Sequence, residues 1–193
     1  MDPISISLLV AMGAGAAAAA ARWRRARGRQ QAPRDEQSPT KNRRPSPPAA
    51  GEHRVGDVLL YMGDEYWLAG ELCLTRDGSA AMRLYSAPER GKDRWLAFPR
   101  EGESAYVLRA DDALEAMGWP GTEIPRQGAV LRPVEQGACV IAPSGEVEQR
   151  WEGVGRYAVF RAMEQVAVVV EQSGQRLALM GKAIPRRLLE KLG

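Results

Sequence analysis

The sequence predicts a mainly β domain that follows one transmembrane helix and a disordered linker. From residue 54 onward, short apolar runs alternate with turn residues at the spacing of an all-β fold. Helical periodicity is confined to two short segments. Near the N-terminus, a charge-free apolar run is followed at once by arginines. We therefore divide the chain into an anchor (1–21), a basic, proline-rich linker (22–53) and a β-rich domain (54–193).

The anchor prediction rests on residues 4–21, which read ISISLLVAMGAGAAAAAA and carry no charge. As a helix this run is about 27 Å long, close to the roughly 30 Å hydrocarbon core of a bilayer. Alanine contributes little to insertion, so two other interpretations stay open: a cleaved signal, and a soluble or surface helix. We expect residues 4–21 to contact the lipid bilayer.

The residues that flank this run predict its orientation. Only Asp2 is charged before it, whereas arginines follow it directly. Positive charge is retained in the cytosol, so the N-terminus is expected outside and the folded domain in the cytosol. The Ala/Arg-rich composition suggests a bacterial source, so the expected location is the bacterial cytoplasmic membrane. The membrane flank consists of Arg22, Trp23, Arg24, Arg25, Arg27 and Arg29.

The positive charge of the chain is concentrated in and next to the linker. Residues 22–54 contain ten Lys/Arg and three Asp/Glu, whereas the whole chain has a net charge of only +3. The β-rich domain is therefore net acidic, which disfavours nucleic acid as a partner. Proline-rich, polar composition without apolar periodicity predicts that the linker is disordered.

The β-rich domain is expected to contain about ten short strands. Asp77-Gly78 and Ser173-Gly174 are typical of tight hairpin turns. Short helices are predicted at Asp111–Met117 and Pro185–Leu192. The strands are expected at Asp57–Met62, Tyr66–Thr75, Ala80–Ser86, Trp95–Pro99, Tyr106–Arg109, Ala138–Ala142, Val147–Trp151, Gly155–Arg161, Gln165–Glu171 and Arg176–Met180.

Two loosely similar halves, about 54–110 and 128–193, favour two packed antiparallel sheets or two small β-barrels in tandem. The similarity between the halves is too weak to establish a repeat, and the choice between these arrangements stays open.

The sequence offers no pattern typical of a catalytic or metal site. His53 is the only histidine, which disfavours a His-based metal cluster and a Ser-His-Asp mechanism. Cys73 and Cys139 lack zinc spacing and lie in apolar runs. We therefore expect no catalytic residue, no cofactor and no bound metal, and predict that the protein is not an enzyme.

Four aromatic residues are the candidates for a binding face: Tyr66, Tyr85, Trp95 and Tyr157. Aromatic residues in strands are more often part of a hydrophobic core, so both roles are carried forward. We expect Trp95 to lie in the core against the first hairpin.

Short motifs are spread over the whole β-rich domain: Val55–Tyr61, Gly63, Tyr66, Gly70–Leu72 and Arg94–Leu96, followed by Glu135–Ala138, Gly145, Tyr157, Glu171 and Gly181. In these residues the domain resembles the bacterial domain-of-unknown-function family 4178. Met82 and Leu84 depart from it, since they stand where the family has Trp and Glu. The resemblance implies a β-rich fold, no known catalytic residue and a membrane-associated partner.

The function expected from these patterns is that of a membrane-tethered, non-catalytic interaction module, with the bilayer and another membrane-associated protein as partners. The alternative is a small-molecule sensor or an enzyme that uses an aromatic sheet face. An interior filled by side chains would favour the module, whereas a polar cavity would favour the alternative. The oligomeric state is left open.

Overall fold

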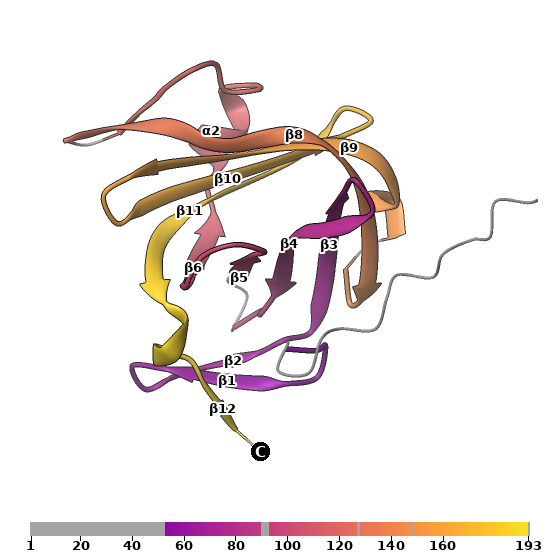
Figure 1. Ribbon diagram of the computed structural model, residues 1–193, viewed down its shortest axis with the longest axis vertical. Helices are drawn as coiled ribbons and strands as arrows, with labels where there is room; N and C mark the ends of the chain where they lie inside the picture. The colour runs from indigo at the N-terminus through magenta and orange to yellow at the C-terminus, as the bar shows by residue number, and fades with distance from the viewer. Residues whose placement is uncertain (1–52, 90–92, 127, 148, 193) are drawn as a thin grey trace, which may run out of the picture. The chain divides into compact units, whose positions relative to one another are not determined.

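The computed structural model describes residues 53–89, 93–126, 128–147 and 149–192 (Figure 1). The predicted anchor at 1–21, its arginine flank at 22–29 and the rest of the linker up to residue 52 lie outside these ranges. Across the residues that are described, no helix has the length and apolar character needed to cross a membrane.

The described part of the chain is mainly β, as predicted, and contains a single closed barrel. The barrel strands are β3 (Gly70–Arg76), β4 (Ser79–Ser86), β5 (Arg94–Pro99), β6 (Ser104–Ala110), β8 (Ala129–Gly145), β9 (Gly153–Ala162), β10 (Gln165–Gln172) and β11 (Gln175–Pro185). All neighbouring strands are antiparallel. We call β3–β6 the N-terminal meander and β8–β11 the C-terminal meander.

Two seams join the meanders into the barrel. At one seam β6 pairs with β11, and at the other β3 pairs with β8. In Figure 1 the strands of the C-terminal meander cross those of the N-terminal meander steeply. The two sequence halves therefore build one barrel together, and the prediction of barrels in tandem is wrong. Each meander alone would leave the backbone N–H and C=O groups of its two edge strands unpaired. In the barrel these groups pair with the edge strands of the other meander.

Side chains fill the barrel interior. One continuous cluster includes Leu72 and Leu84 from the N-terminal meander and Tyr157, Val168 and Leu179 from the C-terminal meander, all fully buried. An eight-stranded barrel is narrow enough for inward-pointing side chains to fill it completely. This interior is therefore the core of the fold.

A separate three-stranded sheet covers the outside of the N-terminal meander. Its strands are β1 (Val58–Tyr61), β2 (Asp64–Trp67) and β12 (Glu190–Leu192), in the order β12-β1-β2. Leu59 and Tyr66 from this sheet pack with Tyr85, Leu96 and Phe98 in a second buried cluster. We call this second cluster the outer cluster.

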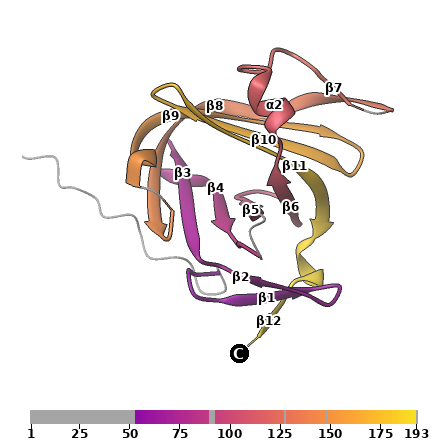
Figure 2. The same cartoon turned by 180° about the vertical axis from the view of Figure 1, so that it is seen from behind.

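On the C-terminal meander, a third buried cluster lies beneath α2 (Asp112–Ala116) and β7 (Ile124–Arg126). Leu114 and Ile124 pack there against Phe160 and Val169. Figures 1 and 2 place α2 over the C-terminal meander, on the side of the barrel opposite the three-stranded sheet. Both outer faces of the barrel are therefore partly covered.

The predicted local structures at two hairpins and one helix are confirmed. Asp77-Gly78 has φ angles of 53° and 75°, and Ser173-Gly174 has φ angles of 49° and 82°, as a tight type I′ turn requires. Asp111 caps α2, because its side chain accepts a hydrogen bond from the amide of Leu114 at 2.7 Å.

Three predicted elements are wrong. The expected strand Tyr66–Thr75 is broken between β2 and β3, where the chain passes from the small sheet into the barrel. The expected strand Val147–Trp151 contains a 3-10 turn, η1 (Gln149–Trp151). The expected helix Pro185–Leu192 is a 3-10 turn, η2 (Arg186–Leu188), followed by β12, because pairing with β1 outweighs the helical spacing of its leucines.

The placement of Trp95 also differs from the prediction. Its side chain is partly buried against the interior cluster, whereas its neighbour Leu96 belongs to the outer cluster that contacts the first hairpin. Successive residues of a strand point to opposite faces, so Trp95 and Leu96 cannot both face that hairpin. The prediction that Trp95 lies in the core against the first hairpin is therefore wrong: Trp95 is partly buried and packs against the interior cluster on the other side of the sheet.

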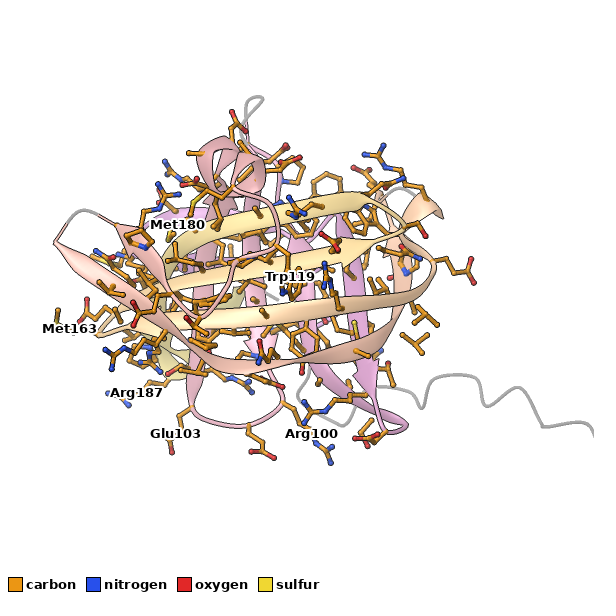
Figure 3. All side chains as sticks on the ribbon, turned by 90° about the horizontal axis from the view of Figure 1, so that it is seen from above. Arg100, Glu103, Trp119, Met163, Met180 and Arg187 are labelled. Carbon is orange, nitrogen blue, oxygen red and sulfur yellow. The ribbon has the colours of Figure 1, made fainter. Side chains whose placement is uncertain are left out.

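An ion-pair cluster lies on the outer face of the C-terminal meander. Glu171 of β10 pairs with Arg176 at 2.5 Å and also with Arg156 of β9. The Arg156 guanidinium stacks on Trp119 at 4.0 Å from the ring centroid, and Figure 3 shows Trp119 over this meander. Arg176 also donates to the carbonyl of Glu115, so the cluster ties the α2 segment to the barrel.

We expect Glu171→Gln to destabilise the protein at neutral pH but not at low pH. Hydrogen bonds from Arg176 and Arg156 hold the pKa of Glu171 below its ordinary value of 4.5, despite some desolvation. A carboxylate with a lowered pKa contributes stability that is present above pH 4.5 and is lost as the pH falls through the folded-state pKa. Chemical denaturation of both proteins between pH 7 and pH 3 checks this.

The stability gap between the wild type and Glu171→Gln should narrow steadily below pH 4.5. Glu190→Gln serves as the control, since Glu190 is exposed and forms no ion pair with a described residue. If the difference in unfolding free energy between the wild type and Glu171→Gln stayed constant down to pH 3, the ion pairs of Glu171 with Arg176 and Arg156 would not be its cause.

Candidate binding site

A cleft of about 250 Å³ opens on the outside of the barrel beside β4 and β5. Two of its lining residues, Tyr85 and Phe98, belong to the outer cluster. His53 lines it from the start of the described chain, and Ala80, Met82 and Pro99 complete its apolar surface. Arg83, Arg100 and Arg186 supply all of its charged groups, so we call it the arginine cleft.

One wall of the arginine cleft is aromatic. Phe98 packs edge-on against Tyr85, with ring centroids 5.7 Å apart, and against the His53 ring at 4.7 Å. The Tyr85 hydroxyl donates a hydrogen bond of 2.7 Å to the carbonyl of His53. Strand alternation accounts for this wall, since Tyr85 and Phe98 lie on adjacent strands with side chains on the same face.

Arg83 lies on the same face as this wall and has a carboxylate partner. Its guanidinium donates to Glu71 of β3 at 2.6 Å, and both side chains are largely buried. Burial alone would lower the pKa of Arg83, but the hydrogen bond and the charge of Glu71 raise it above its ordinary value. Arg83 therefore stays protonated, and its charge is offset within the protein.

Arg186 and Arg100 differ from Arg83 because no described carboxylate forms an ion pair with either of them. Arg186 is the first residue of η2, and its guanidinium donates to the carbonyls of Ser104 and Pro99. These neutral acceptors fix the guanidinium without offsetting its charge. Arg100 is exposed at the end of β5, and Figure 3 shows it projecting from the edge of the barrel.

A second hollow, of about 300 Å³, lies at one end of the barrel and carries mixed charge. Its charged lining residues are Arg76, Asp77, Arg100, Glu101 and Glu135, of which Arg100 also lines the arginine cleft. The hydroxyl of the buried Tyr157 donates to the Glu135 carboxylate. Burial, the hydrogen bond and the charge of Glu135 raise the pKa of Tyr157, so the phenol stays protonated.

A third hollow, between the first hairpin and the β6–β11 seam, is also mixed in charge. Tyr61 and Tyr66 line it together with Asp64, Arg109 and Lys182. The Lys182 ammonium lies 5.4 Å from the centroid of the Tyr61 ring. Burial raises the pKa of Tyr66, which packs under the Arg94 guanidinium.

The four aromatic residues proposed from the sequence do not form one face. Tyr66 and Tyr85 lie in the outer cluster, whereas Tyr157 and Trp95 lie in or against the barrel interior. Tyr85 is the member of the set that lines the arginine cleft, and Tyr66 lines the third hollow.

Sequence reasoning missed the arginines and Phe98 of the cleft. Arg100 follows Pro99 and Arg186 follows Pro185, but no local pattern distinguishes them from other surface arginines. They lie far apart in the chain and meet because β5, β6 and β11 are neighbours in the barrel. Only the strand order could have indicated that they converge.

In the part of the chain that the structure describes, no group of three or more His, Cys, Asp or Glu side chains is placed to hold a metal ion. Cys139 is buried, and burial raises the pKa of its thiol to about 11.

Comparison with known proteins yields no match: no family model, no curated protein and no solved structure is similar to this chain. The resemblance to domain-of-unknown-function family 4178 therefore stays a prediction.

Proposed function

We propose that this protein is a non-catalytic binding module tethered to the cytosolic face of a bacterial cytoplasmic membrane. The observation that carries the proposal is the filled barrel interior, which leaves binding to the outer surface of the barrel. On that surface the arginine cleft combines an aromatic wall with two arginines, Arg100 and Arg186, that form no ion pair with a described carboxylate. A partner that carries a complementary anionic group fits such a surface.

The tether in this proposal rests on the sequence. Residues 4–21 are apolar and uncharged, and the arginines that follow them favour a cytosolic location for everything C-terminal. Another membrane-associated protein is the partner expected for a module held near the bilayer. Confinement to the same surface raises the effective concentration of two such proteins.

A second candidate function is that of a small-molecule sensor. The arginine cleft favours it, because convergent polar groups around an apolar wall are typical of ligand sites. Its volume of about 250 Å³ lies just below the roughly 300 Å³ at which such sites begin. This favours an anchoring group of side-chain size over a complete drug-sized ligand.

Topology reporters test the tether. A reporter that is active only in the cytosol, fused after the last residue of the full chain, should be active, and one active only in the periplasm should be silent. In a control variant, glutamine replaces Arg22, Arg24, Arg25, Arg27 and Arg29, and part of the population should then invert. Periplasmic activity of the unchanged chain would overturn the proposal and favour a cleaved signal.

A further inference from the structure

We propose that the arginine cleft is the recognition site of the module and that it binds an anionic group, carboxylate or phosphate, carried on a flat apolar body. The inference rests on the proposed binding role and adds the chemistry of the ligand. It does not depend on the membrane tether, because every residue that it uses lies in the described domain.

The charged groups that line the cleft favour an anionic ligand. Its lining contains three arginines and no Asp or Glu. Glu71 offsets Arg83 from outside the cleft, whereas Arg100 and Arg186 have no ion-pair partner among the described residues. The cleft therefore holds an excess of positive charge, which an anion would neutralise.

The arginines of the cleft are also placed to bind an anion. Carbonyls of Ser104 and Pro99 already hold the Arg186 guanidinium in place, so little side-chain entropy is lost when it binds a ligand. A guanidinium presents several N–H donors in one plane and matches carboxylate and phosphate oxygens. Arg100 is exposed and can approach the same anion from the rim.

The aromatic wall specifies what the anion is attached to. Phe98 and the His53 ring form an apolar surface inside the cleft, with the guanidinium of Arg186 5.8 Å from the centroid of the Phe98 ring. A flat apolar body can pack on this wall while its anionic end reaches the arginines. A bare inorganic anion would use the charges but not the wall.

The other two hollows do not offer the same chemistry. The barrel-end hollow shares Arg100 with the cleft but adds Asp77, Glu101 and Glu135, and the third hollow sets Asp64 beside Arg109 and Lys182. In both hollows carboxylates offset part of the positive charge, which weakens the attraction for an anion. Of the three hollows described above, the arginine cleft is the one lined by cationic groups without a carboxylate.

Titration of the full-length protein in non-ionic detergent micelles with small probes tests this assignment. We expect phenyl phosphate and benzoate to bind, and to bind more weakly as salt is raised. Inorganic phosphate should bind about tenfold more weakly than phenyl phosphate because it cannot pack on the wall. Benzylamine, which has the same ring with a cationic end, should not bind. The comparison of phenyl phosphate with benzoate shows which anion the cleft prefers.

Substitutions locate the probe in the cleft. Arg100→Gln should weaken phenyl phosphate binding about tenfold, with no loss of stability, because the Arg100 side chain forms no hydrogen bond or ion pair with a described residue and the backbone bond from its amide to Ala81 is kept. Arg187→Gln removes the same charge from the neighbouring exposed position outside the cleft and should change the affinity by less than about twofold. Arg186→Lys keeps the charge but loses the planar donors, and should also weaken binding.

If Arg100→Gln and Arg187→Gln lowered the affinity for phenyl phosphate equally, the inference would be overturned, because this result would show non-specific attraction to a basic surface. Binding of benzylamine as tight as that of benzoate, or no binding of either anion, would overturn it as well. None of these outcomes affects the topology reporters, so failure of this inference and failure of the proposed tether are distinguishable.

Discussion

Replacing Gly181 with alanine is expected to destabilise the domain by about 3 kcal/mol or more. Gly181 lies on β11 opposite Leu108 of β6, at one of the two seams that close the barrel. A Cβ at this position would lie 1.9 Å from the carbonyl oxygen of Val107 and 2.9 Å from the Cα of Leu108. Backbone atoms of a paired strand cannot swing aside, so the strands must separate.

Thermal unfolding followed by circular dichroism measures this effect. The unfolding midpoint of Gly181→Ala should fall by about 10 °C or more, or the variant should fail to fold. Gly121→Ala is the matched control, because a Cβ there meets nothing within 4 Å and the residue is exposed. A Gly181→Ala variant as stable as Gly121→Ala would contradict the β6–β11 pairing.

Tyr157→Ala is expected to cost about 3–5 kcal/mol, the range for truncating a large aromatic side chain in a core. Tyr157 is fully buried within the cluster that fills the barrel. Its removal leaves a cavity that strands on all sides cannot close, because their positions are fixed by the hydrogen-bond ladder. Urea denaturation gives the free energy of unfolding.

Two further variants separate burial from hydrogen bonding at this position. Tyr157→Phe keeps the ring and removes the hydroxyl that donates to Glu135, so we expect a smaller loss of about 1–2 kcal/mol. Val154→Ala changes an exposed side chain of the same strand and should stay within about 0.5 kcal/mol of the wild type. Similar stabilities for Tyr157→Ala and Val154→Ala would show that Tyr157 lies outside the core.

Local features of this fold could be predicted from the sequence, whereas the pairing of distant strands that closes the barrel could not. Asp77-Gly78 and the Asp111 cap are determined by residues within one turn, and both were predicted. The β3–β8 seam joins residues about seventy positions apart, such as Gly70 and Gly145, and no periodicity encodes such a pairing. The long strand β8 was predicted only in its C-terminal half, at Ala138–Ala142, because Pro133 and a register shift next to it interrupt the pattern further upstream.

The candidate site shows the same difference between local features, which the sequence predicts, and long-range contacts, which it does not. Tyr85 was predicted as a candidate because aromatic residues in strands are visible in the sequence, and it does line the cleft. Arg186 was missed because the segment that contains it was expected to be a helix, whereas it forms η2 and then β12. Its position over β5 and β6 depends on where β11 ends in the barrel. The charge of the cleft thus arises from the topology.

The most direct test of the closed barrel is a set of nuclear Overhauser effects between backbone protons across its two seams. We predict cross-strand contacts between Cys73 and Ala142 at the β3–β8 seam, and between Lys182 and Val107 at the β6–β11 seam, in the same folded molecule. Both sets arise only if the two meanders form one barrel. Contacts within each meander with none across either seam would contradict the closed barrel, and with it the assignment of binding to the outer surface.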